Sequence, residues 1–226
     1  MDTYRTEEEQ VEALKKWWEE NGRSTIAAVA LALAAGFGWN YWQGYQQQQA
    51  ESASLLYEEM MASVGQSGEA AQAQTIKTLG ERLKGTYPSS TYAQFAALHL
   101  ARIAVVEGRL EDAEAELRWV LTQGPAPELA LLAELRLARV KAALGDSQAA
   151  LEILAAAQPG AFAAAYAEAE GDIYLDLGDS ASAIAAYERA LGLAVASQGG
   201  ASEALRLKLS ALTPVPAREL AAAAEQ

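Results

Sequence analysis

The sequence predicts an all-α protein with one N-terminal membrane-spanning helix followed by a solenoid of stacked helix pairs. Alanine is abundant throughout and the strand-favouring residues Val, Ile, Thr and Phe are sparse, so helix is favoured over strand. A long apolar segment near the start, residues 24–42, contains no charged side chain. Farther along the chain, similar segments recur around three glycines that are 37 and 33 residues apart, which indicates a helical repeat.

The overall composition narrows the range of functions. The chain has 226 residues and a net charge of -13, and no basic stripe exists that could neutralise the phosphates of a nucleic acid. The simplest role of the acidity is solubility. Cysteine is absent and His99 is the only histidine, so disulfides, thiolate catalysis and Cys-ligated zinc are excluded. The sequence therefore predicts no catalytic, metal or cofactor site, and the protein is not expected to be an enzyme.

Residues 1–23 are predicted to form a cytoplasmic amphipathic segment. The stretch Thr6–Glu9 has the form of a capping box, and Asn21-Gly22 is a plausible end for the helix that it starts. The apolar residues of this helix fall largely on one face: Val11, Leu14, Trp17 and Trp18. Such a helix either lies in the membrane interface with its tryptophans among the headgroups, or docks onto a cytoplasmic partner.

Residues 24–42 are predicted to cross the membrane, and they read STIAAVALALAAGFGWNYW. As a helix they rise about 28 Å, close to the thickness of the hydrocarbon core. Trp39, Tyr41 and Trp42 gather at the far end, where aromatic rings favour the headgroup zone. The alternatives are a buried core helix and a cleaved signal peptide. Bulky residues follow the apolar run and a long acidic stretch precedes it, so a retained anchor is favoured.

The basic residues around the span predict its direction. Arg5, Lys15, Lys16 and Arg23 precede it, and the next basic residue is Lys77. Because basic residues accumulate on the cytoplasmic side, the N-terminus is placed in the cytoplasm and most of the chain on the other side of the membrane.

The repeats share a fixed pattern around Gly108, Gly145 and Gly178. A small residue lies seven positions before each glycine, an alanine five positions after it and a large residue nine positions after it. In order, these residues are Ala101, Ala113 and Leu117, then Ala138, Ala150 and Leu154, then Gly171, Ala183 and Tyr187. The small residues allow two antiparallel helices to cross closely, and the glycine allows the chain to turn between them. Each pair needs its neighbours to cover its apolar face, so the pairs stack.

This pattern resembles the tetratricopeptide repeat. Residues 164–197 match it best, and residues 94–127 and 131–163 match it more weakly, with Leu100 and Leu137 at the usual leucine position. The fourth position of the motif is not aromatic in any of the three units. The alternative is an alanine-rich helical bundle without true repeats.

The remaining segments complete the predicted domain, residues 51–212. Residues 43–50 form a linker that is either a flexible spacer or a helical extension of the span. The residues that follow it, together with a helix near Glu69–Lys84, form a degenerate first unit. A closing helix near 201–212, carrying Leu205, Leu209 and Leu212, covers the last core face, and residues 213–226 form a C-terminal tail.

The first helices of the units are expected to line a concave protein-binding face. Its inward residues are predicted to be Phe95, Leu98, Arg102, Leu135, Arg139, Glu168, Asp172 and Leu175. This face would be basic and apolar at one end and acidic at the other, and suited to a polypeptide. The alternative is that Leu98 and Leu135 are ordinary core and that the charges are solvated. No asparagine occupies these positions, so a Lys/Asn clamp for a C-terminal carboxylate is disfavoured.

The chain as a whole resembles the YfgM family of Gram-negative bacteria, whose members are ancillary subunits of the SecYEG translocon. The resemblance is carried by the segment EQVEALKKWWEENG, by the exit GWNYW of the span and by the repeats. It implies a single-pass inner-membrane protein with a periplasmic domain. It also implies partners: the SecYEG translocon, the periplasmic chaperone PpiD, exported polypeptides and, through the cytoplasmic segment, the regulator RcsB.

Two functions remain open at this point. One is a tethered protein-binding module that assists the transfer and folding of exported proteins. The other is a scaffold or assembly factor for another cell-envelope complex, or an envelope-stress regulator.

Overall fold

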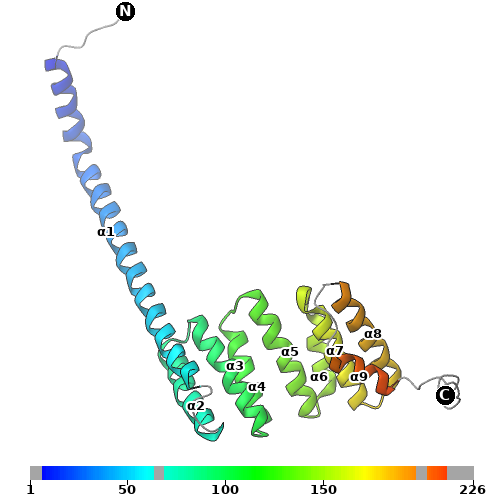
Figure 1. Ribbon diagram of the computed structural model, residues 1–226. Coiled ribbons are helices and arrows are strands. Elements are labelled where there is room, and N and C mark those ends of the chain that lie inside the picture. Colours follow the sequence, from blue (N-terminus) through cyan, green and yellow to red (C-terminus); the bar gives the residue numbers. More distant parts are fainter. Residues whose placement is uncertain (1–6, 64–68, 197–202, 213–226) are drawn as a thin grey trace, which may run out of the picture. The chain divides into compact units, whose positions relative to one another are not determined.

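A computed structural model describes residues 7–63, 69–196 and 203–212, and every element in these ranges is helical (Figure 1). The predicted all-α class is therefore confirmed. The chain divides into two compact units, residues 1–52 and residues 53–226. The capping-box residue Thr6 and the predicted tail, residues 213–226, lie outside the described ranges.

The first unit consists of most of helix α1, Glu7–Ala62. It is the one described helix that is long and apolar enough to cross a membrane. Its large apolar side chains, from Ile26 to Trp42, are exposed, as they are in a helix that contacts lipid. The rings of Trp39 and Trp42 lie tilted against each other, with centroids 5.4 Å apart, at the end of the apolar run.

Helix α1 does not end at Asn21-Gly22, so that part of the prediction was wrong. The Asn21 side chain donates to the carbonyl of Trp17, and the hydroxyls of Ser24 and Thr25 donate to the carbonyl of Asn21. These local bonds satisfy polar groups while the helix continues. The helix also runs through residues 43–50, so that segment is a helical extension, with Gln47 Nε2 bonded to Glu51 Oε1 at 2.9 Å.

The second unit stacks helices along the chain, each packed against the next, with α5 also packed against α7. It starts with the end of α1 and contains the predicted helix pairs. The helices are α2 (Glu69–Thr86), α3 (Thr91–Val106), α4 (Leu110–Thr122), α5 (Pro127–Ala143), α6 (Ser147–Ala156), α7 (Ala163–Asp176), α8 (Ser180–Ala196) and α9 (Glu203–Leu212). The second predicted pair begins earlier than expected, because Pro127 suits the first turn of a helix, where no backbone N–H is needed.

The repeat glycines turn the chain as predicted. Gly108, Gly145 and Gly178 have φ values of 73°, 86° and 77°, a left-handed conformation that glycine adopts without steric cost. In each turn the glycine N–H and the next N–H bond back to carbonyls of the preceding helix; Arg109 N, for example, lies 2.8 Å from Ala104 O. This pair of bonds is the Schellman motif, which ends a helix cleanly.

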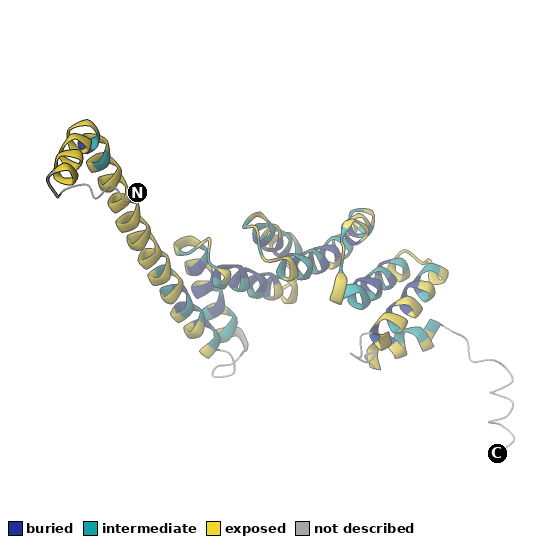
Figure 2. Cartoon of the chain, turned by 90° about the horizontal axis from the view of Figure 1, so that it is seen from above, coloured by how far each residue is buried: buried dark blue, intermediate teal, exposed yellow. Residues whose placement is uncertain are grey.

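The core lies between successive helix pairs, and in α3 to α8 the buried residues occupy the sides that face other helices (Figure 2). Leu117 and Val120 of α4 share one cluster with Leu137 and Val140 of α5. A second cluster joins α5, α6 and α7, and a third joins α7, α8 and α9. Because each cluster takes side chains from two neighbouring pairs, the pairs stack as a solenoid.

Helix α9 closes the stack. Leu205 is buried against Tyr187 and Ala190 of α8, while Leu209 and Leu212 are partly buried beside it. The predicted closing helix is therefore present with the predicted leucines in contact with the core.

Candidate functional site

The residues predicted to face inward all come from α3, α5 and α7. Phe95 is half-buried, whereas Arg102, Arg139 and Leu175 are exposed. These side chains are accessible to a partner, and their role in binding stays a prediction.

Leu98 and Leu135 lie in the core. They are 6% and 3% exposed, Leu98 in the cluster with Leu117 and Leu135 in the cluster with Tyr166. These two leucines are therefore core residues, as the alternative interpretation expected. They lie beneath the predicted binding face and are not exposed on it.

The acidic end of the predicted face is engaged inside the molecule. Lys208 of α9 lies 2.9 Å from Glu168 and 2.6 Å from Asp172, and the Tyr187 hydroxyl donates to Asp172 at 2.7 Å. Burial opposes the charge of Lys208, but the two carboxylates outweigh it and raise its pKa. The closing helix therefore supplies one positive charge to the two carboxylates that the sequence assigned to a partner.

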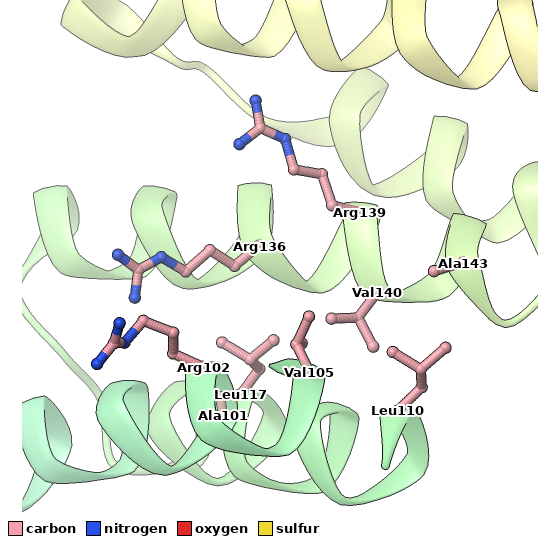
Figure 3. A pocket seen from close by; sticks show the side chains of 9 residues that line it. All are labelled: Ala101, Arg102, Val105, Leu110, Leu117, Arg136, Arg139, Val140 and Ala143. Carbon is pink, nitrogen blue, oxygen red and sulfur yellow. The ribbon is translucent and has the colours of Figure 1, made fainter. Parts of the chain in front are cut away.

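The basic end of the face is open. Arg102 of α3 and Arg136 and Arg139 of α5 border a cavity of about 330 Å³ between α3, α4 and α5. Its other lining side chains are apolar: Ala101, Val105, Leu110, Leu117, Val140 and Ala143. In Figure 3, Arg102 and Arg136 extend in the same direction with their guanidinium groups close together, while Arg139 points away from them. We call this site the arginine cavity.

A smaller cavity, of about 160 Å³, adjoins the arginine cavity and shares Arg102 and Arg136 with it. Its aromatic wall is made by Tyr57, whose ring centroid lies 6.0 Å from that of Phe95 and 6.3 Å from that of His99. Oη of Tyr57 lies 3.4 Å from Nε2 of His99, a long hydrogen bond.

The sequence analysis missed Arg136, Tyr57 and His99. Arg136 fell between two inward positions of the repeat, although it lies three residues before Arg139 and so shares a helix face with it. Tyr57 belongs to the irregular first unit, where no repeat register was available. The sequence holds no second histidine and no cysteine that could mark His99 as part of a site.

The arginine cavity carries uncompensated positive charge. None of its three arginines forms a salt bridge with a described carboxylate. By contrast, every lysine of the repeat domain does: Lys77, Lys84, Lys141 and Lys208. Burial, followed by the charges of Arg102 and Arg139, lowers the pKa of Arg136. Mutual repulsion of this kind favours an anionic ligand.

The charges also act on the neighbouring histidine. Burial lowers the pKa of His99, and the charges of Arg102 and Arg136 lower it further, so its imidazole is neutral at pH 7. The described residues hold no group of three His, Asp or Glu side chains placed to bind a metal ion. What the arrangement can do is bind an apolar side chain beside a carboxylate.

The chain is similar to a known protein family and to several named proteins. A family model described as a tetratricopeptide repeat-like domain matches residues 15–214. The ancillary SecYEG translocon subunit of Haemophilus influenzae is 35% identical over 184 residues, which cover 81% of this chain and 88% of the relative. The protein of that name from Escherichia coli K12 is 32% identical over 213 residues, covering 94% of this chain and 100% of the relative. A third, from Neisseria gonorrhoeae, is 26% identical over 212 residues.

Proposed function

This chain belongs to the tetratricopeptide repeat-like family of ancillary SecYEG translocon subunits, and we propose that it is a membrane-tethered protein-binding module that works beside a SecYEG translocon. The observation that carries the proposal is that one chain joins a membrane-length apolar helix to a repeat domain with an open, charged and apolar cavity. Such a protein can hold a polypeptide close to the membrane without acting on it chemically. The role proposed is therefore binding and not catalysis.

The proposed location is the inner membrane, with the N-terminus in the cytoplasm and the repeat domain in the periplasm. It is supported by the basic residues Lys15, Lys16 and Arg23 before the apolar run and by the absence of basic residues from there to Lys77. In this orientation the arginine cavity faces the compartment into which exported chains emerge.

The proposed clients are exported polypeptides, which the domain would pass to a periplasmic chaperone such as PpiD. The exposed apolar face before the span, Val11, Leu14, Trp17 and Trp18, supports a separate contact at the cytoplasmic side of the membrane, either with lipid headgroups or with a regulator such as RcsB.

The test is photo-crosslinking in intact cells. A photoreactive residue at Trp39 or Tyr45, near the end of the apolar run, is expected to capture a SecYEG subunit, and the same residue at exposed Arg118 of α4 serves as the control. Adducts from Trp39 and Tyr45 to a different envelope complex, with none to SecYEG, would replace the proposal with the scaffold function.

A further inference from the structure

We propose that the arginine cavity is a docking site for an acidic polypeptide segment that places one leucine-sized side chain beside two separated groups of carboxylates. This inference rests on the proposed protein-binding function and specifies the chemistry of the bound partner. It concerns Arg102, Arg136 and Arg139 together with the apolar walls contributed by Val105 and Leu110.

The first argument is electrostatic. The chain has a net charge of -13, yet three arginines meet at one cavity with no described carboxylate in salt-bridge distance, while Lys77, Lys84, Lys141 and Lys208 are all paired. Guanidinium groups held near each other repel, and a bound carboxylate removes that repulsion while it accepts charge-assisted hydrogen bonds. A carboxylate-bearing ligand is thus the partner that this charge pattern complements.

The second argument concerns shape. The cavity of about 330 Å³ lies at the lower end of the usual range for ligand pockets, large enough for one aliphatic side chain of the partner. Its rim includes Val105, which is 44% exposed, so an apolar anchor would cover a side chain that water now contacts. A ligand that is bound through its charge alone would not require the apolar lining of the cavity.

The third argument concerns the arrangement of the contacts. Arg102 and Arg136 lie together at one side of the cavity and Arg139 points away from them (Figure 3). A ligand that meets all three must carry acidic groups at two separate places beside its apolar anchor. A helix with Glu, Leu and Glu at intervals of three or four residues presents two separated carboxylates and one apolar side chain on a single face.

A polypeptide fits this site better than a lipid surface does. Arg136 is half-buried in the cavity, where a flat layer of headgroups does not reach. The net charge of -13 also repels an anionic bilayer at longer range, whereas a single peptide segment interacts mainly with the local cluster within a Debye length.

The binding test uses the full chain in a neutral detergent and a fluorescent helical peptide with the Glu–Leu–Glu pattern. We expect the double variant Arg102→Gln/Arg136→Gln to weaken the peptide's affinity by about tenfold or more, since two charge-assisted contacts are lost. The matched control is Arg82→Gln with Arg206→Gln, which removes the same charge from exposed arginines outside the cavity and should leave the affinity within about twofold.

Two control peptides separate the contributions. Replacing both Glu by Gln should abolish most of the binding, and replacing Leu by Ala should weaken it by severalfold. Equal binding of the Gln peptide, or equal loss in the Arg82/Arg206 variant, would overturn the proposal. So would direct binding of vesicles containing phosphatidylglycerol that is lost in Arg102→Gln/Arg136→Gln, when the peptide itself does not bind, because the site would then recognise lipid.

His99 supplies a readout that a general loss of structure would not imitate. As the only histidine of the chain, it gives an unambiguous ring signal in NMR spectra. A carboxylate bound at Arg102 and Arg136 should raise its pKa, and the Gln peptide should not. If the peptide-binding tests fail while Trp39 still crosslinks to SecYEG, only the inference about the arginine cavity is wrong. If the SecYEG crosslinks are absent, the proposed function itself is wrong.

Discussion

At the scale of single residues, the contact between Gly171 and Tyr187 explains why one repeat uses glycine where the others use alanine. A Cβ at Gly171 would lie 2.5 Å from Cδ1 and Cε1 of Tyr187. The Tyr187 ring is fully buried, and its hydroxyl is held by Asp172. Leu117 and Leu154 stand at the equivalent positions of the other units, opposite Ala101 and Ala138. The larger ring of Tyr187 thus requires a smaller residue on the opposite helix, so the total side-chain volume at the helix crossing stays similar.

Gly171→Ala should lower the free energy of unfolding by about 1–3 kcal/mol, because the tyrosine ring must move from its packed position. Urea denaturation of the full chain in detergent, followed by circular dichroism, measures the change. Gly192→Ala in α8 is the matched control, since nothing lies near its added Cβ, and it should be neutral or stabilising by up to about 1 kcal/mol. Equal effects of the two substitutions would contradict this account of the crossing.

His99 makes stability depend on pH in a defined direction. Burial first, then Arg102 and Arg136, lowers its pKa below 6.5, so the unfolded chain takes up the proton before the folded chain does. The contribution of neutral His99 to the free energy of unfolding is fully present above pH 6.5. It is lost as the pH falls from 6.5 through the lowered pKa of the folded state.

We therefore expect His99→Gln to flatten the dependence of unfolding free energy on pH in that window. Arg102→Gln should raise the pKa of His99 while burial still keeps it below 6.5. An NMR titration of the histidine ring measures the pKa directly. A pKa above 6.5 in the unmodified chain would contradict the arrangement of charges described here.

Of the residues predicted to face inward, Arg102 and Arg139 line the arginine cavity, and the rest of that cavity depends on packing. Arg102 and Arg139 were identified from the register of the repeat, because that register fixes which residues face inward. The pairing of Glu168 and Asp172 with Lys208 joins residues 40 and 36 positions apart, through a closing helix whose docking position the repeat pattern does not encode. Likewise, the burial of Leu98 and Leu135 reflects neighbours in the adjacent helix pairs.

At the scale of elements, helix α9 was predicted from the sequence, but the contact of its Lys208 with α7 was not. Leu205 is 3% exposed against α8, while the bonds of Lys208 to α7 are partly exposed to solvent. Water screens such ion pairs, so each contributes less than about 1 kcal/mol, whereas a buried leucine contributes several times more. Leu205 is accordingly the main attachment of the closing helix.

Leu205→Ala should release α9, with a loss of about 2–4 kcal/mol in local stability. Lys208→Met, which keeps an apolar side chain of similar length, should cost less than about 1 kcal/mol. Hydrogen exchange of the backbone amides of 203–212 distinguishes the two: rapid exchange is expected in Leu205→Ala and nearly unchanged exchange in Lys208→Met. The reverse order would mean that charge, and not packing, holds this helix.

Helix α1 illustrates where local sequence signals were overruled. Asn21-Gly22 is a common helix end, but a C-terminal cap forms only if the chain leaves the helix, and here the hydroxyls of Ser24 and Thr25 bond back to Asn21. The three repeat glycines did fulfil their role, because each is followed directly by the start of a new helix. The same residue type thus ends a helix only where the following segment packs elsewhere.

At the scale of the whole molecule, the chain combines a lipid-compatible helix with a repeat domain whose charges are unevenly compensated. Several of the described ion pairs of the domain link its helices, such as Lys84 with Glu116 and Lys141 with Glu114. The arginine cavity differs, because three arginines from α3 and α5 border one cavity and none of them forms a salt bridge with a described carboxylate. The paired charges stabilise the domain, whereas the unpaired arginines of the cavity can bind a partner. This difference is the physical basis of the proposed function.

The most direct test of this account places a photoreactive residue at Val105, on the rim of the arginine cavity, and at Val195, exposed on α8 outside the cavity. We predict that Val105 captures exported polypeptides during active secretion, that Arg102→Gln/Arg136→Gln greatly reduces these adducts, and that Val195 yields few. Equal capture from both positions, or capture of cytosolic proteins alone, would contradict the claim that this tethered domain holds exported chains at its arginine cavity.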